Sequence, residues 1–251
     1  MQLPLPVTLP DDETFDSFIS GGNDEVVSLL SCVASHSPDW RGEPALALLD
    51  AASIPLINLV GSSGRGKSHL LYATCHQLAA REIPHAYVNF TDVVNLSPKL
   101  LEALEQLPVI CLDNLEAIAG HAAWEEAVFD LINRVSETRI GLLIVAAQSG
   151  PNASNVRLPD LRSRISAGLT YQLVSLNDEQ RGEVLSSRAQ QRGLSLSAQA
   201  LHYLLNHSQR DLPSLMALLD RLDQRSLQEQ KKISVALVKR ELAEDTDPSA
   251  S

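Results

Sequence analysis

The 251-residue sequence has few basic and few aromatic side chains. Its 20 Lys and Arg residues are outnumbered by 31 Asp and Glu residues, and only 4% of its residues are aromatic. The net charge of −11 disfavours broad contact with a nucleic-acid backbone, and so few rings cannot build a stacking platform for single strands. We therefore expect no strong direct DNA binding by this chain alone.

Long apolar runs and cysteine pairs are missing too. No run approaches the roughly 18 apolar residues of a membrane span, and residues 1–20 lack the basic start and apolar stretch of a secretion signal. The three cysteines, Cys32, Cys75 and Cys111, lie far apart on apolar segments, which is typical of reduced core thiols. These absences favour a cytoplasmic protein without a membrane partner.

What the sequence does contain is a phosphate-binding pattern. An apolar segment at 56–60 leads into Gly61-Ser62-Ser63-Gly64-Arg65-Gly66-Lys67-Ser68, which reads G-x-x-x-x-G-K-S. Glycines allow turns that point several N–H groups at one anion, Lys67 brings a cation to the β- and γ-phosphates, and Ser68 offers a hydroxyl to Mg²⁺. A helix starting near Lys67 would place its positive end on the phosphates. We predict that these eight residues and His69 bind a nucleotide, rather than form an ordinary surface loop.

A second candidate position follows the apolar segment 109–112. Asp113 ends that segment and is suited to hold Mg²⁺ through water, although an aspartate can also simply cap a strand. The next residue is Asn114, whose amide can hold a water molecule but cannot accept its proton. We therefore expect the protein to hydrolyse ATP weakly by itself.

Strands and helices alternate in the first two thirds of the chain. Apolar segments predict strands near 56–60, 86–90, 109–112, 142–146 and 169–173, and periodicity predicts helices after Lys67, near 100–104 and at 124–135. A polar loop is expected from Gln148 to Pro159. This alternation indicates an α/β fold with a largely parallel sheet covered on both faces.

From about Ser175 the pattern becomes helical throughout. Helices are expected at 179–192, 197–206, 212–227 and 235–242. We divide the chain into an extended tail at 1–10, a nucleotide-binding α/β domain at 11–174, a small all-α lid domain at 175–243 and a polar, disordered end at 244–251.

The parallel sheet, the phosphate-binding loop and the trailing helices together resemble the AAA+ ATPases. Residues 15–21, Phe-Asp-Ser-Phe-Ile-Ser-Gly, with Asn23 are similar to the F-D-x-F…G-x-x-N segment of the bacterial replication initiator DnaA. Leu161-Arg162-Ser163-Arg164 is similar to the L-x-S-R of its box VII, which carries an arginine finger. Gln2-Leu3-Pro4-Leu5-Pro6 is similar to short peptides that dock on the bacterial sliding clamp. With no basic helix-turn-helix segment after the lid, residues 2–243 resemble the Hda family of DnaA inactivators.

The resemblance implies a regulatory activity with two protein partners. A clamp-bound member of that family promotes hydrolysis of the ATP held by DnaA and so represses re-initiation of chromosome replication. The implied partners are DnaA and the DNA polymerase III sliding clamp, and the oligomeric state, for example a homodimer, is left open. The implied cofactors are Mg²⁺ and an adenine nucleotide, with ADP favoured over ATP.

The resemblance also implies roles for individual residues. Arg164 would act in trans as the arginine finger, and Gln148 would lie near the sensor-1 position. The alternatives are a solvated helix arginine and a solvated loop glutamine. The clamp would be bound by Gln2, Leu3, Leu5 and Pro6, whose alternative is a frayed tail, and the base would be bordered by Phe18, Ile19, Gly21 and Asn23.

Two positions depart from the family pattern. Pro213 stands where a sensor-2 arginine is expected, with Arg210 as a substitute, and Asn114 replaces a second acid. Both departures are compatible with a protein that stays diphosphate-bound and acts on its partner's nucleotide. The alternative function is an autonomous AAA+ ATPase such as a helicase loader; a nucleotide kinase would need more phosphate-binding arginines than Arg162 and Arg164.

Overall fold

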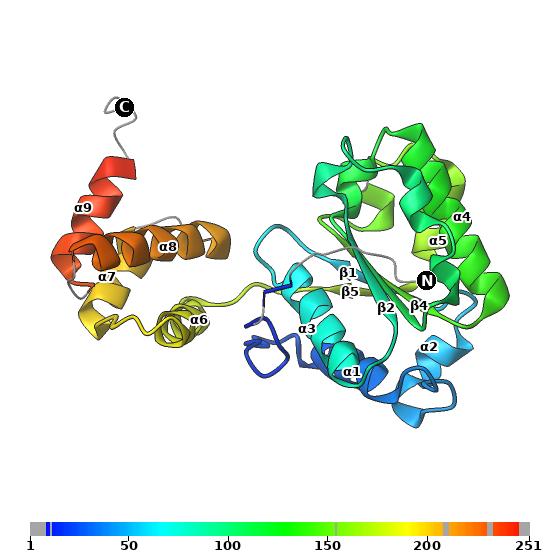
Figure 1. The fold of residues 1–251 in the computed structure, drawn as a ribbon, viewed down its shortest axis with the longest axis horizontal. Helices are drawn as coiled ribbons and strands as arrows, with labels where there is room; N and C mark the ends of the chain where they lie inside the picture. Colours follow the sequence, from blue (N-terminus) through cyan, green and yellow to red (C-terminus); the bar gives the residue numbers. More distant parts are fainter. Residues whose placement is uncertain (1–8, 11, 154, 208–210, 230–232, 246–251) are drawn as a thin grey trace. The chain divides into compact units, whose positions relative to one another are not determined.

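The computed structural model describes residues 9–10, 12–153, 155–207, 211–229 and 233–245. The chain divides into two compact units after Val174 (Figure 1). The predicted clamp-binding residues Gln2, Leu3, Leu5 and Pro6 lie outside the described residues. Within the described ranges, none of the helices combines the length and the apolar character that crossing a membrane requires.

The first unit is built on a five-stranded parallel sheet with the strand order β2-β3-β4-β1-β5. Its strands are β1 (Leu56–Val60), β2 (His85–Asn89), β3 (Val109–Asp113), β4 (Leu142–Ala147) and β5 (Leu169–Gln172). Every residue of β1 and β3 is buried, as expected for central parallel strands whose two faces are both covered. The α/β fold with a parallel sheet is thus confirmed.

Helices cover both faces of this sheet (Figure 1). One face carries α1 (Asp24–His36) and α3 (Lys67–Ala80), and the other carries α4 (Ala122–Thr138) and α5 (Pro159–Ser166). The short helix α2 (Ala47–Ala51) contributes Leu49 to the α1 and α3 side. Because side chains alternate along each strand, Leu59 faces α3 while Asn58 and Val60 face the α5 side.

Two of the predicted elements differ from those found. The helix expected near 100–104 is replaced by two 3₁₀ turns, Pro98–Leu101 and Leu104–Gln106, because Ala103 between them has a positive φ of 63°. The loop expected up to Pro159 is followed at once by α5, which the sequence analysis did not predict as a helix. With eight residues, α5 is too short to show clear helical periodicity.

The described residues of the second unit form the four predicted helices. They are α6 (Asp178–Gln191), α7 (Ala198–His207), α8 (Leu212–Glu229) and α9 (Val235–Asp245). Asn177 and Gln180 form a capping box at the start of α6, and the buried Glu241 forms ion pairs with Arg221 at 3.0 Å and Arg225 at 2.6 Å. Because α9 continues to Asp245, Glu244 and Asp245 belong to a helix and not to the predicted disordered end. Ala243 and Glu244 are strong helix formers, which explains the extension.

Candidate nucleotide-binding site

The phosphate-binding loop joins β1 to α3 through left-handed glycines. Gly64 and Gly66 have φ values of 75° and 87°, which side chains rarely tolerate. A Cβ atom on Gly66 would also lie 2.6 Å from the ring of Phe18. The loop starts beside the end of β4, since Gly61 N donates to Ala147 O at 3.2 Å. Both the turn and the close approach of Phe18 therefore require glycine at position 66.

Lys67 lies against the inside of this loop. Its Nζ donates to Gly61 O at 2.5 Å and to Ser62 O at 3.0 Å, and the residue is only 7% exposed. Burial lowers the pKa of Lys67, while the charges of Glu116 and Asp113 act to raise it. The loop thus holds a buried cation against its own carbonyl groups, where a phosphate would supply negative charge.

Asp113 is fully buried at the end of β3. Its Oδ2 accepts from the Tyr87 hydroxyl at 2.8 Å and its Oδ1 accepts from Asn114 N at 2.9 Å. Among the residues that the structure describes, no Lys or Arg forms an ion pair with it. A buried carboxylate without an ion-pair partner favours a cation close by.

The donor set at this end of the sheet fits Mg²⁺. Ser68 and Asp113 supply hard oxygen atoms, the ligands that Mg²⁺ prefers, and phosphate oxygens and water usually supply the others. No group of three His, Cys, Asp or Glu side chains in the described ranges could hold a metal ion by itself. The metal would therefore come with the nucleotide, as P-loop proteins bind it.

Asn114 faces the end of β2. It has a left-handed φ of 56°, and its Nδ2 donates to Asn89 Oδ1 at 2.9 Å and to Thr91 Oγ1 at 3.1 Å. Its amide nitrogen is therefore engaged in ordering residues 89–91. That Asn114 holds a water molecule in the site stays a prediction.

Glu116 is a carboxylate near the loop that the sequence analysis did not single out. It lies in the 3₁₀ turn Leu115–Ile118 after β3, and its Oε2 accepts from Gln148 N at 3.1 Å. Its charge is near enough to raise the pKa of Lys67. The only signal in the sequence is its place three residues after Asp113. Position 114 itself carries no acid, but Glu116 places a carboxylate two residues further along the chain.

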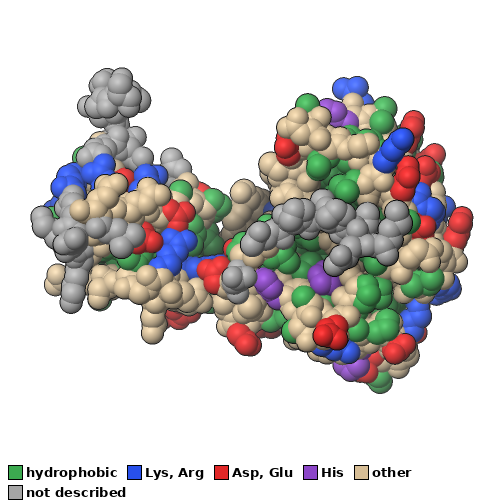
Figure 2. Space-filling view, viewed as in Figure 1, with side chains coloured by type: hydrophobic (Ala, Val, Ile, Leu, Met, Phe, Trp, Pro, Cys, Tyr) green, Lys and Arg blue, Asp and Glu red, His purple; other side chains and the backbone are tan. Residues whose placement is uncertain are grey.

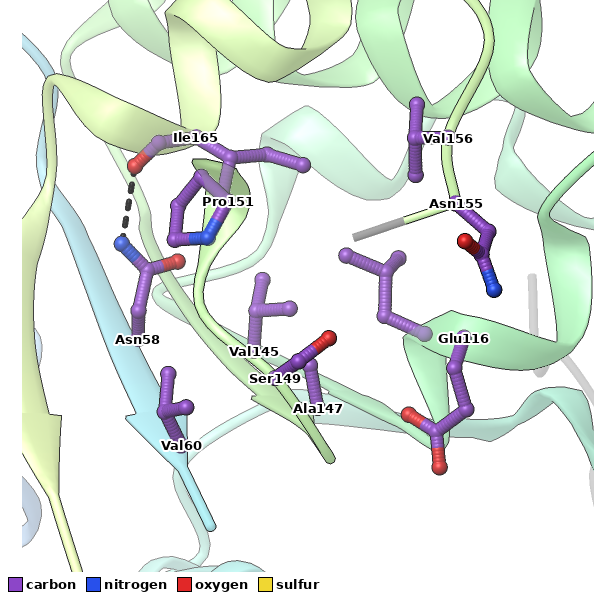
Figure 3. A pocket seen from close by; sticks show the side chains of 11 residues that line it. Asn58, Val60, Glu116, Val145, Ala147, Ser149, Pro151, Asn155, Val156 and Ile165 are labelled. Carbon is purple, nitrogen blue, oxygen red and sulfur yellow. Dashed lines mark hydrogen bonds between the residues drawn. The ribbon is translucent and has the colours of Figure 1, made fainter. Parts of the chain in front are cut away.

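A small hollow, lined in part by Glu116 and Asn58, lies on the α5 side of the sheet (Figure 3). It spans about 410 Å³, part of which is open to solvent. Asn58 Nδ2 donates to Ile165 O at 2.8 Å, while its Oδ1 is buried without a hydrogen-bond partner. Apolar side chains such as Val145 and Val156 form most of the wall. The hollow lies across the sheet from α3, and residues 61–68 are not among those that line it.

The N-terminal segment packs directly on the first turn of α3. The rings of Phe18 and His69 meet edge to face at 5.1 Å, and His69 Nε2 donates to Thr14 O at 2.9 Å. Burial lowers the pKa of His69, so its ring is neutral near pH 7. His69 therefore contacts the segment that carries Phe18, which places Phe18 beside the loop.

Asn23 fastens the same segment to the end of the sheet. Its Oδ1 accepts from Val174 N at 2.8 Å, and its Nδ2 donates to Ser20 O at 2.7 Å and Val174 O at 3.3 Å. Gly21, with a φ of 54°, forms the turn before α1. These contacts hold Ile19 and its neighbours near the nucleotide loop; contact of the four residues with a base stays a prediction.

Gln148, predicted near the sensor-1 position, and Arg164, the predicted arginine finger, lie on different parts of the first unit. Gln148 is exposed and directly follows β4, next to the start of the phosphate-binding loop. Arg164 is exposed on α5, on the opposite face of the sheet from α3, and no acidic side chain in the described part of the chain pairs with it. Arg164 thus points to solvent rather than into the chain's own loop.

The structure also places the residue that departs from the lid pattern. Pro213 is in the first turn of α8, where a proline is tolerated because the N–H groups have no helical partner. Asp211, two residues before Pro213, accepts a hydrogen bond from Ser214 N at 2.9 Å. Arg210, the suggested substitute, lies outside the described residues. Position 213 therefore serves the start of a helix and brings no charge.

Comparisons with known proteins give a family match, a curated relative and similar solved structures. Residues 178–242 match the family described as Hda, lid domain. An uncharacterized protein of Haemophilus influenzae is 36% identical over 239 residues, which cover 95% of this chain and 97% of that protein. Domain III of the Thermotoga maritima replication initiation protein DnaA superposes with a TM-score of 0.78 at 17% identity, covering 96% of this chain and 100% of that one. AMPPCP-bound DnaA from Aquifex aeolicus gives 0.68 at 18% identity, covering 96% and 71%.

The parallel sheet with its phosphate-binding loop, followed by a helical second unit, is the AAA+ fold seen in domain III of DnaA. Within that class the chain belongs to the Hda family.

Proposed function

We propose that this protein is a nucleotide-bound regulator that docks on the sliding clamp and promotes hydrolysis of the ATP held by DnaA. The observation that carries this proposal is the exposed Arg164 on α5, a guanidinium without an acidic partner in the described ranges. Such a group can neutralise charge developing on another subunit's γ-phosphate, as arginine fingers do. The tail 1–10 would supply the clamp contact.

The resident nucleotide in this proposal is an adenine nucleotide, ADP rather than ATP, with Mg²⁺. A solved DnaA relative holds AMPPCP, which supports adenine. The chain has Asn114 in place of an acid after Asp113, and Pro213 in place of a lid arginine. Both changes remove groups that would recognise or hydrolyse a γ-phosphate.

The test compares two arginines on the same helix. Arg164→Ala should keep fold, nucleotide binding and clamp binding, yet lose stimulation of DnaA-bound ATP hydrolysis by on the order of 10³-fold, the lower end for arginine fingers. Arg162→Ala should have a smaller effect. The measurement is the fraction of DnaA-bound ATP converted to ADP with clamp loaded on DNA. Conversion by Arg164→Ala at the wild-type rate would refute the finger.

An autonomous ATPase is the second candidate, and Glu116 is the observation that favours it. Its carboxylate lies near Lys67 and contacts the end of β4, so it could orient a water molecule. We expect slow turnover by the isolated protein, and little change in it for Glu116→Gln. Rapid turnover that Glu116→Gln abolishes would favour the second candidate.

The surface offers a further observation on partners. On the face of the first unit drawn in Figure 2, acidic and basic side chains are interspersed and no broad basic area stands out among the coloured residues. This agrees with recognition of DnaA and clamp by protein contacts in the proposal, with DNA reached through the clamp.

A further inference from the structure

Hydrogen bonds connect two tyrosines, Tyr72 and Tyr87, to the carboxylate of Asp113. Tyr87 on β2 has its hydroxyl 2.8 Å from Asp113 Oδ2, and the hydroxyl of Tyr72 on α3 is 3.1 Å from that of Tyr87. The two rings lie 5.0 Å apart. A phenol has one proton and a carboxylate only accepts, so Tyr87 donates to Asp113 and Tyr72 is left to donate to Tyr87. The three groups therefore form a directed chain of hydrogen bonds.

This chain fixes the plane of the carboxylate. Tyr87 holds Oδ2, while the backbone N–H of Asn114 holds Oδ1 at 2.9 Å. Two donors on two different oxygens prevent rotation of the group about its bond to Cβ. The remaining lone pairs therefore have a set direction before any ligand arrives.

Burial shields this chain of hydrogen bonds from water. Asp113 is fully buried and Tyr87 is 7% exposed. Water therefore competes little for the hydrogen bond between the Tyr87 hydroxyl and Asp113.

We propose that Tyr87 is a positioning residue that sets the orientation of Asp113 for Mg²⁺ bound with the nucleotide. This inference rests on the proposed function, in which the loop holds a Mg²⁺–nucleotide complex. Partners that orient metal-binding groups without touching the metal typically cost 10–100-fold in metal affinity when removed. Tyr72 supports Tyr87 from one step further away, so its removal has the smaller effect.

Tyr87→Phe tests the proposal because it removes the hydroxyl and keeps the ring. Binding of ADP is measured by calorimetric titration, first with increasing Mg²⁺ and then in EDTA. We expect the Mg²⁺ concentration for half-maximal tight binding to rise by about tenfold, with affinity in EDTA unchanged. Tyr72→Phe should give a smaller rise. Tyr171→Phe, a half-buried tyrosine of the same unit, is the matched control and should give none.

A double-mutant cycle makes the test specific to Asp113. If Tyr87 acts through that carboxylate, Tyr87→Phe should have no further effect on the Mg²⁺ dependence once Asp113→Asn is present. Equal loss of affinity with Mg²⁺ and in EDTA, or an unchanged Mg²⁺ dependence, would overturn the inference while nucleotide binding stands. Absence of ADP binding by the wild type would instead overturn the proposed function and the inference with it.

Discussion

The carboxylate of Glu125 accepts a hydrogen bond from the backbone N–H of Leu158 at 2.7 Å. Glu125 lies in the first turn of α4, and Leu158 immediately precedes α5. The same buried carboxylate also accepts from Arg157 N at 3.0 Å and Gly120 N at 2.7 Å. One side chain therefore fixes the start of the helix that carries Arg164.

Glu125→Gln should destabilise the first unit by ~1–3 kcal/mol. The substitution replaces one carboxylate oxygen by an NH₂ group, which cannot accept a hydrogen bond from a backbone N–H. Unfolding in denaturant measures this, and hydrogen exchange at Arg157 and Leu158 should become faster. The neighbouring Glu126 is exposed, so Glu126→Gln is the matched control. Equal unfolding curves for the two variants would contradict the role given to Glu125.

Lys67→Ala should lower nucleotide affinity by about tenfold or more, a loss of at least ~1.4 kcal/mol, since it removes the cation that reaches the phosphates. Calorimetric titration with ADP measures the change. Lys99→Ala removes an exposed lysine elsewhere in the unit and should leave the affinity as it is. Wild-type affinity in Lys67→Ala would mean that the loop is not the nucleotide site.

Gln2→Ala combined with Leu5→Ala should abolish clamp binding and leave ADP binding intact. The three prolines in residues 1–10 exclude a regular helix, so the tail can bind as an extended peptide. A pull-down with purified clamp measures the first effect and calorimetry the second. Retained clamp binding would mean that the tail is an ordinary chain end.

His69→Gln should reduce the loss of stability on acidification. Burial lowers the pKa of His69 below its usual 6.5, so the unfolded chain takes up this proton first. The contribution of neutral His69 to the free energy of unfolding is complete above about pH 6.5. It is lost as the pH falls from there toward the pKa of His69 in the folded protein. Unfolding in denaturant at pH 7.0 and 5.5 should show a smaller difference for His69→Gln than for wild type. His121→Gln, an exposed histidine, should behave as wild type; an identical pH slope in His69→Gln would refute the assignment.

The sequence by itself determined the features that depend on neighbours along the chain. The loop Gly61–Ser68 follows β1 because a glycine-rich turn, a lysine and a serine at this spacing have one common use. The parallel sheet follows from buried apolar strands that alternate with helices. The four helices after Val174 follow from apolar residues at helical spacing.

Only the tertiary structure decided which distant side chains meet. Tyr87 and Asp113 are neighbours because β2 and β3 pair in one register, and Cys75 and Cys111, separate in sequence, bring their sulfur atoms within 3.9 Å. Glu116, which follows β3, reaches the residue after β4 because β3 and β4 pair as well. A tyrosine or glutamate is compatible with many environments, so its type alone indicates no partner. Such contacts exist only after strands pair and helices pack, and they decide how the site's charges are oriented.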